Sequence, residues 1–473
     1  MPHQEPPMPP GNRWPGPLKP IVARLSGADT RYAAILAGAM IATNLVALIT
    51  TVAFGRLLHV EGYGELAAIL STFIILSVPG AALQVATARE GSLGHLGEGR
   101  QFATTLRRWT ITLAFVTLLV TAVSIMLRQP LATIIGVGKD QEWAAAFVPP
   151  AACVWILLSI QRGALQATRA YPAVGLSMVA EQVARLVLGA GIAFVVVKSF
   201  KVTGAYLGTP LAMLTMSVIL GFVLSRRLGK HEKARVAHGL RRLTADAWVA
   251  IVGLALIAVL QNVDVIVAQH RLHGTNAGSY AAAAVAAKVV VWVAIGIGFY
   301  LLPEAARRHA LGQDARPVLR KAMIMTGAVA APCLIVYAVV PKLLLELAFG
   351  DKYSQGAEAL FDLGIAMAFL SVCYLSVQLL LAMREVKFLW FLAAVAIIEP
   401  AALLFGPGGD SVVGFARTVL VVQVIAATGA FAAAWHASAP PKGGAHLVAD
   451  ADVAAVGGLG SSTTQVPNRA NSL

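Results

Sequence analysis

The stretch FGRLLHVEGYGELAA, from Phe54 to Ala68, is a short polar connector between two long apolar runs. A looser copy, AQHRLHGTNAGSYAA, extends from Ala268 to Ala282. The copies lie 214 positions apart, which predicts that the chain consists of two related halves. With that offset the matching residues are Leu58-His59 with Leu272-His273, Gly64 with Gly278, Ala67-Ala68 with Ala281-Ala282, and Glu90 with Glu304.

The apolar runs around these connectors indicate whether water or lipid surrounds the protein. Of its 473 residues, 58% are hydrophobic and 13% are charged, with a mean hydropathy of +0.74, whereas soluble domains carry roughly 25% charged residues. The runs are close to the roughly 20 residues that a helix needs to cross a bilayer. Because lipid offers no partner to free backbone groups, and the short alternating segments of a β-barrel are absent, the sequence predicts an all-α, polytopic membrane protein.

We predict about twelve membrane spans in two six-helix lobes. The N-terminal lobe covers residues 31–224 and the C-terminal lobe covers 247–435, with a basic linker at 225–246. Residues 1–30 and 436–473 are rich in Pro or in Ala, Gly and Ser, and we expect them to be disordered tails. The expected spans are 32–54, 64–88, 109–127, 143–161, 172–197, 204–224, 248–270, 277–302, 322–340, 357–382, 388–406 and 412–434.

The distribution of basic residues predicts the orientation. Most of the 37 Lys and Arg residues fall in the tails and in every second loop if the N-terminus is inside, so both termini are expected in the cytoplasm. The net charge of +14 then reflects topology and contact with anionic lipids. We expect no nucleic-acid partner, because the chain has no soluble basic module. The three cysteines, Cys153, Cys333 and Cys373, lie in apolar runs without metal-ligand spacing, which predicts free thiols and no metal site.

The shared direction of the two connectors predicts a parallel repeat, with a pseudo-two-fold axis along the membrane normal. Two lobes facing each other across a central cavity are typical of a transporter that works by alternating access. We expect glycine turns at Gly62, Gly64, Gly274 and Gly278 to serve as corresponding outer gates, since glycine accommodates backbone changes at little steric cost.

Ionisable residues inside the spans are the candidate site, because such groups are costly in lipid and normally face a cavity or a partner. Six stand out, and their charges sum to zero: Glu181, Arg185, Asp264, Lys288, Glu399 and Arg417.

Several of these residues have more than one interpretation. Glu181 and Arg185, four positions apart, also fit a local ion pair. Arg417 lies close enough to the outer end of its span to reach the interface. Glu399 precedes Pro400 and also fits a hinge.

Lys288 and Asp264 support the most specific hypotheses. Lys288 lies deep in an Ala- and Val-rich span with no acidic residue one turn away, which favours a phosphate-binding role over a pair with another helix. A buried carboxylate such as Asp264 fits coupling to a proton or sodium gradient, or a pair with Lys288. The polar residues expected beside them, lining the cavity or joining helices, are Asn44, Gln84, Gln182, Gln261 and Asn262.

Two stretches resemble a known family. The Gly-Arg-Leu-Leu and Glu-Gly-Tyr-Gly elements between Gly55 and Gly64 are similar to those of bacterial polysaccharide and O-antigen flippases in the multidrug/oligosaccharidyl-lipid/polysaccharide (MOP) superfamily. So is the stretch with Asn262-Val-Asp264, Ala277-Gly-Ser-Tyr280, Lys288 and Pro303-Glu304. The likeness covers roughly residues 30–435, although His59-Val60 replaces the usual Gly-Pro.

The resemblance implies a flippase in the bacterial plasma membrane that moves a polyprenyl-linked oligosaccharide outward for cell-surface polysaccharide assembly. It also implies undecaprenyl diphosphate as the carrier, association with polysaccharide assembly proteins, and no bound cofactor. Other functions stay open: a cation-coupled multidrug antiporter, or, from another class, a membrane-embedded polysaccharide polymerase or ligase. A major-facilitator carrier is disfavoured because the loop REGSLGHLGEGRQFATTLRR lacks its Asp-Arg-x-Gly-Arg motif.

Overall fold

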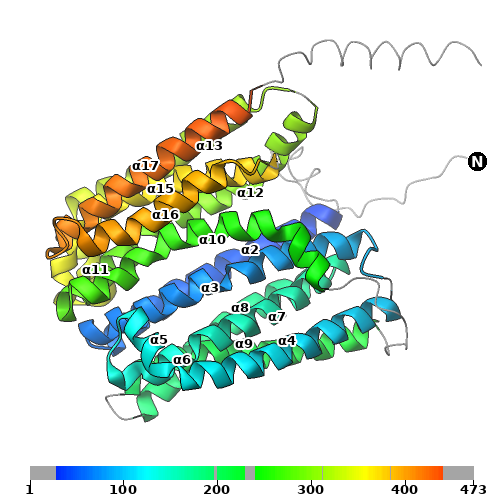
Figure 1. Ribbon diagram of the computed structural model, residues 1–473, viewed down its shortest axis with the longest axis horizontal. Helices are drawn as coiled ribbons and strands as arrows, with labels where there is room; N and C mark the ends of the chain where they lie inside the picture. Colours follow the sequence, from blue (N-terminus) through cyan, green and yellow to red (C-terminus); the bar gives the residue numbers. More distant parts are fainter. Residues whose placement is uncertain are drawn as a thin grey trace, which may run out of the picture.

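The computed structural model describes residues 28–97, 99–196, 200–228, 240–311, 313–383 and 385–439. Within these ranges the chain is helical and has no strand, and twelve helices are long and apolar enough to cross a membrane, as predicted. The helices run side by side along the long axis of the molecule (Figure 1). Most of the predicted tails and the central part of the basic linker, 229–239, lie outside the described residues.

The N-terminal half supplies six of these spans, and short helices join its third and fourth spans. Its elements are α2 (Ala28–Leu57), α3 (Val60–Ser92), α4 (Arg100–Met126), α5 (Arg128–Ile135), η2 (Lys139–Gln141), α6 (Glu142–Ala146), α7 (Val148–Ala167), α8 (Tyr171–Val195) and α9 (Lys201–Leu228).

The C-terminal half repeats this order of long and short helices. Its elements are α10 (Leu240–Arg271), α11 (Gly274–Ala287), α12 (Val289–Ala310), α13 (Arg316–Val339), α14 (Pro341–Phe349), η4 (Asp351–Gly356), α15 (Ala357–Ala382), α16 (Phe388–Phe405) and α17 (Val412–Ala437).

The 214-position offset reappears in the element boundaries. Helices α3 and α11 both begin directly after a histidine, His59 or His273. The short helices α5 and α14 both end before a glycine with positive φ, Gly136 or Gly350. This agreement extends the sequence repeat from one connector to a second pair of elements and supports the two-half interpretation.

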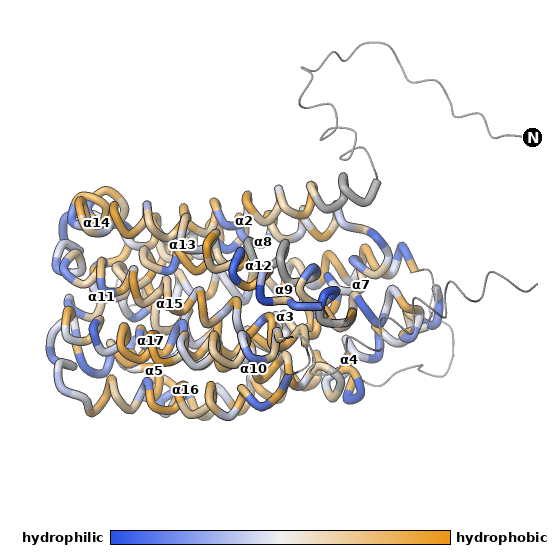
Figure 2. The backbone as a smooth tube through the Cα atoms, turned by 90° about the horizontal axis from the view of Figure 1, so that it is seen from above, coloured by the Kyte–Doolittle hydropathy of each residue, from blue (hydrophilic) through white to orange (hydrophobic). Residues whose placement is uncertain are grey.

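The two ends of the bundle differ. We call the end at which α2 begins and α17 ends the proximal end, and the end that carries α5, α6, α14 and η4 the distal end (Figure 1). The middle of the bundle is hydrophobic and polar segments gather toward both ends (Figure 2). Large apolar side chains such as Trp390, 84% exposed, cover the sides of the bundle. This is the pattern of a protein whose outer wall faces lipid.

The expected glycine turn after the first span is wrong in its position. Helix α3 begins at Val60, so Gly62 and Gly64 lie inside its first turns, and the chain turns at His59. Glu61 in the first turn favours this early start, because a negative charge complements the helix N-terminus. Likewise Gly278 lies within α11, and only Gly274, at the start of that helix, has positive φ.

The eighth span, predicted over 277–302, is present as one apolar stretch over Gly274–Gly296 with a local irregularity at Lys288. Helix α11 ends at Ala287 and α12 begins at Val289, so the irregularity falls at Lys288. The hydroxyl of Tyr337 on α13 donates a 2.8 Å hydrogen bond to the carbonyl oxygen of Ala286. The backbone at Lys288 stays right-handed helical, because its N–H donates to the carbonyl oxygen of Ala284 at 3.1 Å and its own carbonyl oxygen accepts from the N–H of Trp292 at 3.2 Å.

Contacts between the halves are uneven. Helix α10 packs along α3 of the other half, and the two run side by side in Figure 1. Helix α2, the counterpart of α10, packs mainly on α8 of its own half and has no comparable contact with α11 or α12 within the described residues. One seam between the halves is therefore tightly packed and the other is loose.

Candidate functional site: a cationic cavity between the halves

A cavity of about 390 Å³ lies between the two halves. Its walls come from α2, α3, α8 and α9 of one half and from α10, α11 and α12 of the other. The charged residues that line it are Arg185 and Lys288, and no carboxylate is among the described lining residues. The cavity therefore presents a net positive surface within a mostly apolar wall.

Five of the residues predicted from the sequence line this cavity: Arg185, Gln182, Lys288, Gln261 and Asn262. They come from both halves, which are distant in sequence. Three others lie apart from it, namely Asn44, Gln84 and Arg417. Asn44 is on the exposed side of α2. Arg417 is 71% exposed and donates a 3.2 Å bond to Asp362, which agrees with the interfacial alternative.

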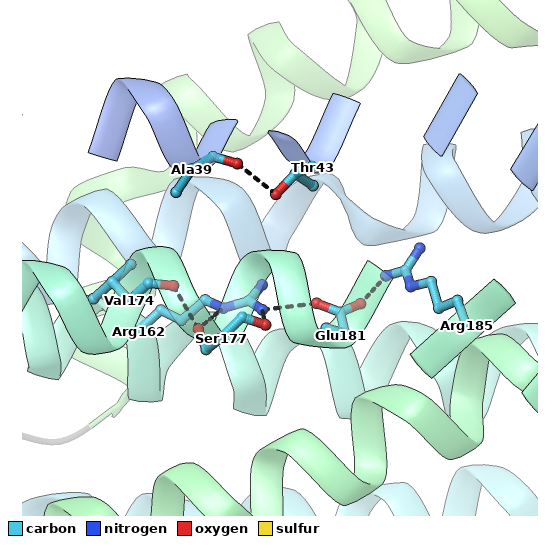
Figure 3. Close-up of polar contacts among 7 residues, drawn as sticks. All are labelled: Ala39, Thr43, Arg162, Val174, Ser177, Glu181 and Arg185. Carbon is cyan, nitrogen blue, oxygen red and sulfur yellow. Dashed lines mark hydrogen bonds and ion pairs between the residues drawn. The ribbon is translucent and has the colours of Figure 1, made fainter. Parts of the chain in front are cut away.

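Arg185 is held in place by a buried ion cluster in the N-terminal half. Its guanidinium donates to Glu181 Oε1, so the predicted pair between these residues is present. A second arginine, Arg162 on α7, donates a 2.7 Å hydrogen bond to Glu181 Oε2 (Figure 3). Arg162 also bonds the hydroxyl of Ser177 at 3.1 Å and its carbonyl oxygen at 3.0 Å. One carboxylate therefore bridges two guanidinium groups, and the cluster keeps a net positive charge.

Aromatic rings support both guanidinium groups of this cluster. Arg185 lies 5.9 Å from the ring centroids of Phe73 and of Trp155, and Arg162 lies 5.6 Å from that of Trp155. Cations over aromatic faces are stabilised without losing their charge. Arg185 Nε is buried and has no hydrogen-bond partner. The guanidinium of Arg185 therefore has one N–H group that makes no hydrogen bond to the described residues.

Lys288 approaches the cavity from the opposite half. Its side chain is 6% exposed, and its ammonium donates a 3.1 Å hydrogen bond to Asn262 Oδ1 on α10. Among the described residues no carboxylate lies within ion-pair distance of it, so a direct Asp264–Lys288 pair does not form. Lys288 lies within the candidate span Gly274–Gly296, so this ammonium is in the membrane interior. A buried cation held only by a neutral amide is well suited to pair with an anion.

Two carboxylates of the C-terminal half, Asp264 and Glu399, belong with Gln423 to a separate buried polar cluster, which we call the carboxylate pocket. Asp264 on α10 accepts a 2.8 Å hydrogen bond from the hydroxyl of Tyr280. Glu399 on α16 accepts a 3.0 Å hydrogen bond from Gln423 on α17, whose amide nitrogen also donates to the carbonyl oxygen of Leu260. Asp264 and Glu399 are fully buried, and three oxygens of this pocket have no donor: Asp264 Oδ1, Glu399 Oε2 and Gln423 Oε1.

Sequence reasoning missed Arg162 and Gln423. Arg162 directly follows the predicted end of the fourth span, so it was counted with the loop cations, yet α7 continues to Ala167. Gln423 is a single amide in an apolar run, and that isolated polar side chain is the sequence feature by which it could have been predicted. Two of the four glycines predicted to form outer gates, Gly64 and Gly278, lie at a close contact between helices α3 and α11. A Cβ on Gly64 would lie 2.9 Å from the Cα of Gly278, so the two equivalent glycines face each other.

Comparison with known proteins identifies solved structures that have a similar fold. No protein-family model and no curated protein sequence matches the chain. Solved structures do match. An inward-facing multidrug resistance MATE family transporter of the MOP superfamily has a TM-score of 0.68 at 12% identity, over 89% of this chain and 96% of its own. The lipid II flippase MurJ, in an inward closed conformation, has a TM-score of 0.67 at 12% identity, over 84% of this chain and 87% of its own.

A third similar structure is a MOP superfamily transporter from Pyrococcus furiosus, reported with a binding pocket of reverse polarity. It has a TM-score of 0.59 at 13% identity, over 88% of this chain and 97% of its own. The first and third of these structures are described as transporters of the MOP superfamily, and the second as a lipid II flippase. At such low identity they show that this chain shares their fold, and the chemistry of its own cavity has to indicate its cargo.

Proposed function

We propose that this protein is a flippase that carries a polyprenyl-diphosphate-linked oligosaccharide across the bacterial plasma membrane by alternating access. The observation that carries the proposal is the charge of the inter-half cavity, where Arg185 and Lys288 face the space and no described carboxylate does. Buried cations without an equal number of anions favour an anionic cargo. A structural relationship to both lipid II flippase and MATE folds is compatible with this cargo.

The cavity offers two kinds of phosphate contact. Lys288 supplies a compact positive charge, and Arg185 supplies a planar donor fork already aligned by Glu181. A diphosphate between the halves would engage both. Amides of Gln182, Gln261 and Asn262 line the same space and are suited to bind sugar hydroxyls. Because the two cations belong to different halves, cargo binding links the parts that must move relative to each other.

The loose seam between α2 and α12 fits the polyprenyl tail. Residues of both helices, including Thr50 and Trp292, line the cavity, and the two helices do not pack closely within the described residues. A tail in that seam stays in hydrocarbon while the charged head group is sheltered in the cavity. The opposite seam, between α3 and α10, is closed by packing.

We further propose that the buried pocket of Asp264, Glu399 and Gln423 binds the coupling cation. Its three unpartnered oxygens come from three helices, and hard cations prefer oxygen ligands of this kind. Tyr280 holds one side of Asp264 and Gln423 holds one side of Glu399, which leaves the other oxygens for an ion. Asn262, which bonds Lys288, is two residues from Asp264 on α10, so ion binding there is positioned to affect the cargo site.

Mass spectrometry of polyprenyl-linked saccharides tests the cargo. Cells lacking this protein are compared with cells restored with wild type, Lys288→Ala, Lys288→Arg or Arg417→Ala. We expect one complete lipid-linked unit to accumulate without the protein. Wild type and Arg417→Ala relieve the accumulation, because Arg417 lies outside the cavity. Lys288→Ala does not, and Lys288→Arg does so in part because it keeps the charge.

Two outcomes would replace this proposal. Absence of a lipid-linked intermediate, together with new sensitivity to cationic drugs, would favour the multidrug antiporter. Elongation or ligation of saccharides by the purified protein would favour a membrane-embedded polymerase or ligase. Full relief by Lys288→Ala would still support a lipid-linked oligosaccharide as the cargo. It would contradict the proposal that the cationic cavity binds this cargo.

A further inference from the structure

A second cavity lies inside the N-terminal half, between α4, α7 and α9. It has a volume of about 390 Å³ and shares no lining residue with the inter-half cavity. Its walls are largely apolar, with Leu106 and Ile111 from α4, Ile160 from α7 and Leu224 from α9. We call it the α4–α9 groove. It is separate from the proposed cargo site and has no assigned role.

The groove opens sideways near the proximal end of the bundle. Its residues come from the beginning of α4, the last part of α7 and the end of α9. Ile111 is 58% exposed and Arg107 is exposed, so the opening faces the surroundings of the bundle. On the orientation that the basic residues predict, this is the inner leaflet, where a lipid head group meets the first turns of α4.

Two polar groups mark the head-group end of the groove. Arg107 contributes a guanidinium, and no carboxylate is among the lining residues described. Gln161 on α7 is only 4% exposed, yet its Oε1 accepts no hydrogen bond. A buried acceptor without a donor is costly, so an occupant that brings a hydroxyl is favoured. The groove thus combines an apolar wall, a fixed positive charge and one unused acceptor.

We propose that the α4–α9 groove binds an anionic phospholipid with a hydroxylated head group, of which phosphatidylglycerol is the simplest example. An acyl chain lies along Leu106, Ile111 and Leu224, and the phosphate pairs with Arg107. A head-group hydroxyl donates to Gln161 Oε1. Charge complementarity selects an anionic lipid over a zwitterionic one, because Arg107 is the charged lining residue and no carboxylate is among the described lining residues.

The groove adjoins the ion cluster of the proposed cargo site. Gln161 faces the groove, and the next residue, Arg162, bonds Glu181 in that cluster. An occupant of the groove therefore packs against the part of α7 that positions the cluster. This proposal rests on the groove itself and holds whether or not the cargo is a lipid-linked oligosaccharide.

Native mass spectrometry of the full-length protein tests the site. The protein is incubated in detergent with phosphatidylglycerol, phosphatidic acid or phosphatidylcholine of matched chains. We expect phosphatidylglycerol to bind most tightly. Arg107→Gln lowers that affinity about tenfold, as expected for one lost charge-assisted contact. Arg108→Gln, which removes the adjacent arginine outside the groove, is the matched control and leaves the affinity unchanged.

A second variant separates lipid binding from a general loss of folding. Gln161→Leu removes the acceptor without burying a charge, so it lowers phosphatidylglycerol binding while the melting temperature in lipid-free detergent changes little. Equal binding of phosphatidylcholine, or equal losses in Arg107→Gln and Arg108→Gln, would overturn the proposal. So would displacement of phosphatidylglycerol by undecaprenyl phosphate at equal concentration, which would assign the groove to the cargo lipid.

Discussion

Arg162 is the residue on which the ion cluster of the N-terminal half depends. It is 2% exposed and links α7 to Ser177 and Glu181 of α8. Arg185 still compensates Glu181 when Arg162 is removed, so the loss comes from the hydrogen bonds of Arg162, and bonds to charged groups contribute about 1.5–3 kcal/mol. We therefore expect Arg162→Ala to lower the free energy of unfolding by that amount, measured by unfolding the protein with sodium dodecyl sulfate in mixed micelles.

Arg128→Ala is the control for this measurement. Arg128 forms a 3.3 Å pair with Glu142, but its side chain is 40% exposed. Exposed pairs contribute less than about 1 kcal/mol, so this variant should differ little from wild type. Similar losses in the two variants would show that burial of Arg162 does not determine its contribution.

The carboxylate pocket predicts a sodium effect on stability. A ligand that binds only the folded state raises the melting temperature. Replacing choline chloride with sodium chloride should therefore raise the wild-type melting temperature, by about 1 °C for each kcal/mol of binding energy in a chain of 473 residues. Asp264→Asn and Glu399→Gln each remove a charged ligand and should abolish the rise. Thermal melts in detergent measure it.

Glu304→Gln supplies a control with a carboxylate outside the pocket. Hydrogen bonds from Arg307 and Arg308 lower the pKa of Glu304 to about 2, so this carboxyl group stays ionised throughout the usable pH range. Its replacement should keep the sodium response. A wild-type melting temperature that is the same in sodium and choline, but changes with pH in an Asp264-dependent way, would instead favour protons as the coupling ion.

A candidate site residue could be predicted from the sequence when its side chain is charged and the rest of its span is apolar. Lys288 and Asp264 stood out because charges in apolar spans are costly. The pairing of Glu181 with Arg185 followed from helical spacing. Arg162 could not be assigned, since its partner is on another helix. The separation of Lys288 from Asp264 also depends on tertiary packing, which provides Asn262 and Tyr280 as their partners.

Helices α3 and α11 meet where two equivalent glycines allow their backbones to approach. A Cβ on Gly278 would collide with the carbonyl oxygen of Val60. Overpacking of this kind costs about 1–3 kcal/mol, and here the obstacle is backbone that cannot rotate away. Gly278→Ala should therefore destabilise the protein by an amount near the upper end of that range, measured in the same micellar unfolding experiment.

Gly327→Ala tests whether this loss comes from the contact. Gly327 lies inside α13, and a Cβ there meets nothing within 4 Å. Alanine is about 0.5–1 kcal/mol better than glycine inside a helix, so this variant should be neutral or more stable. A neutral Gly278→Ala variant would contradict the close contact between α3 and α11.

The elements were predictable to different degrees. The bilayer requires long apolar helices, so twelve spans could be counted from the lengths of the apolar runs in the sequence. Their ends extend past the apolar runs, as at α4, which begins at Arg100, nine positions before the expected start at 109. The irregularity at Lys288 could not be predicted, because the hydrogen bond that Tyr337 donates beside it, to the carbonyl oxygen of Ala286, comes from a distant span.

At the scale of the whole molecule, two contacts join the halves at the distal end and are related by the 214-position offset. Arg56, at the end of α2, donates to the carbonyl oxygens of Leu347 and Ala348 on α14. His270, at the end of α10, donates through Nε2 to the carbonyl oxygen of Thr133 on α5 at 3.0 Å. In each case a basic side chain of one half contacts the C-terminal turn of a short helix in the other half, where the helix dipole favours a cation.

These two contacts should hold the distal end closed, and breaking them should favour a state open to the outside. Each hydrogen bond is worth about 0.5–1.5 kcal/mol, so removing both contacts shifts the equilibrium by about tenfold. We expect Arg56→Ala combined with His270→Ala to expose the cavity outward. The measurement uses Gln261→Cys, a lining position, in a protein whose three natural cysteines are replaced, with a membrane-impermeant maleimide added to intact cells.

The neighbouring Arg271 makes the comparison specific. Arg271 donates to the carbonyl oxygen of Leu404 and to Asp410 at 3.1 Å, both within the C-terminal half. Arg271→Ala therefore removes a similar cationic contact without separating the halves, and labelling at position 261 should stay low. If Arg271→Ala raised labelling as much as the double variant, general loosening of the distal end would explain the result. If neither variant raised it, the paired contacts would not control access, because the packed seam of α3 and α10 would be enough to keep the cavity closed to the outside.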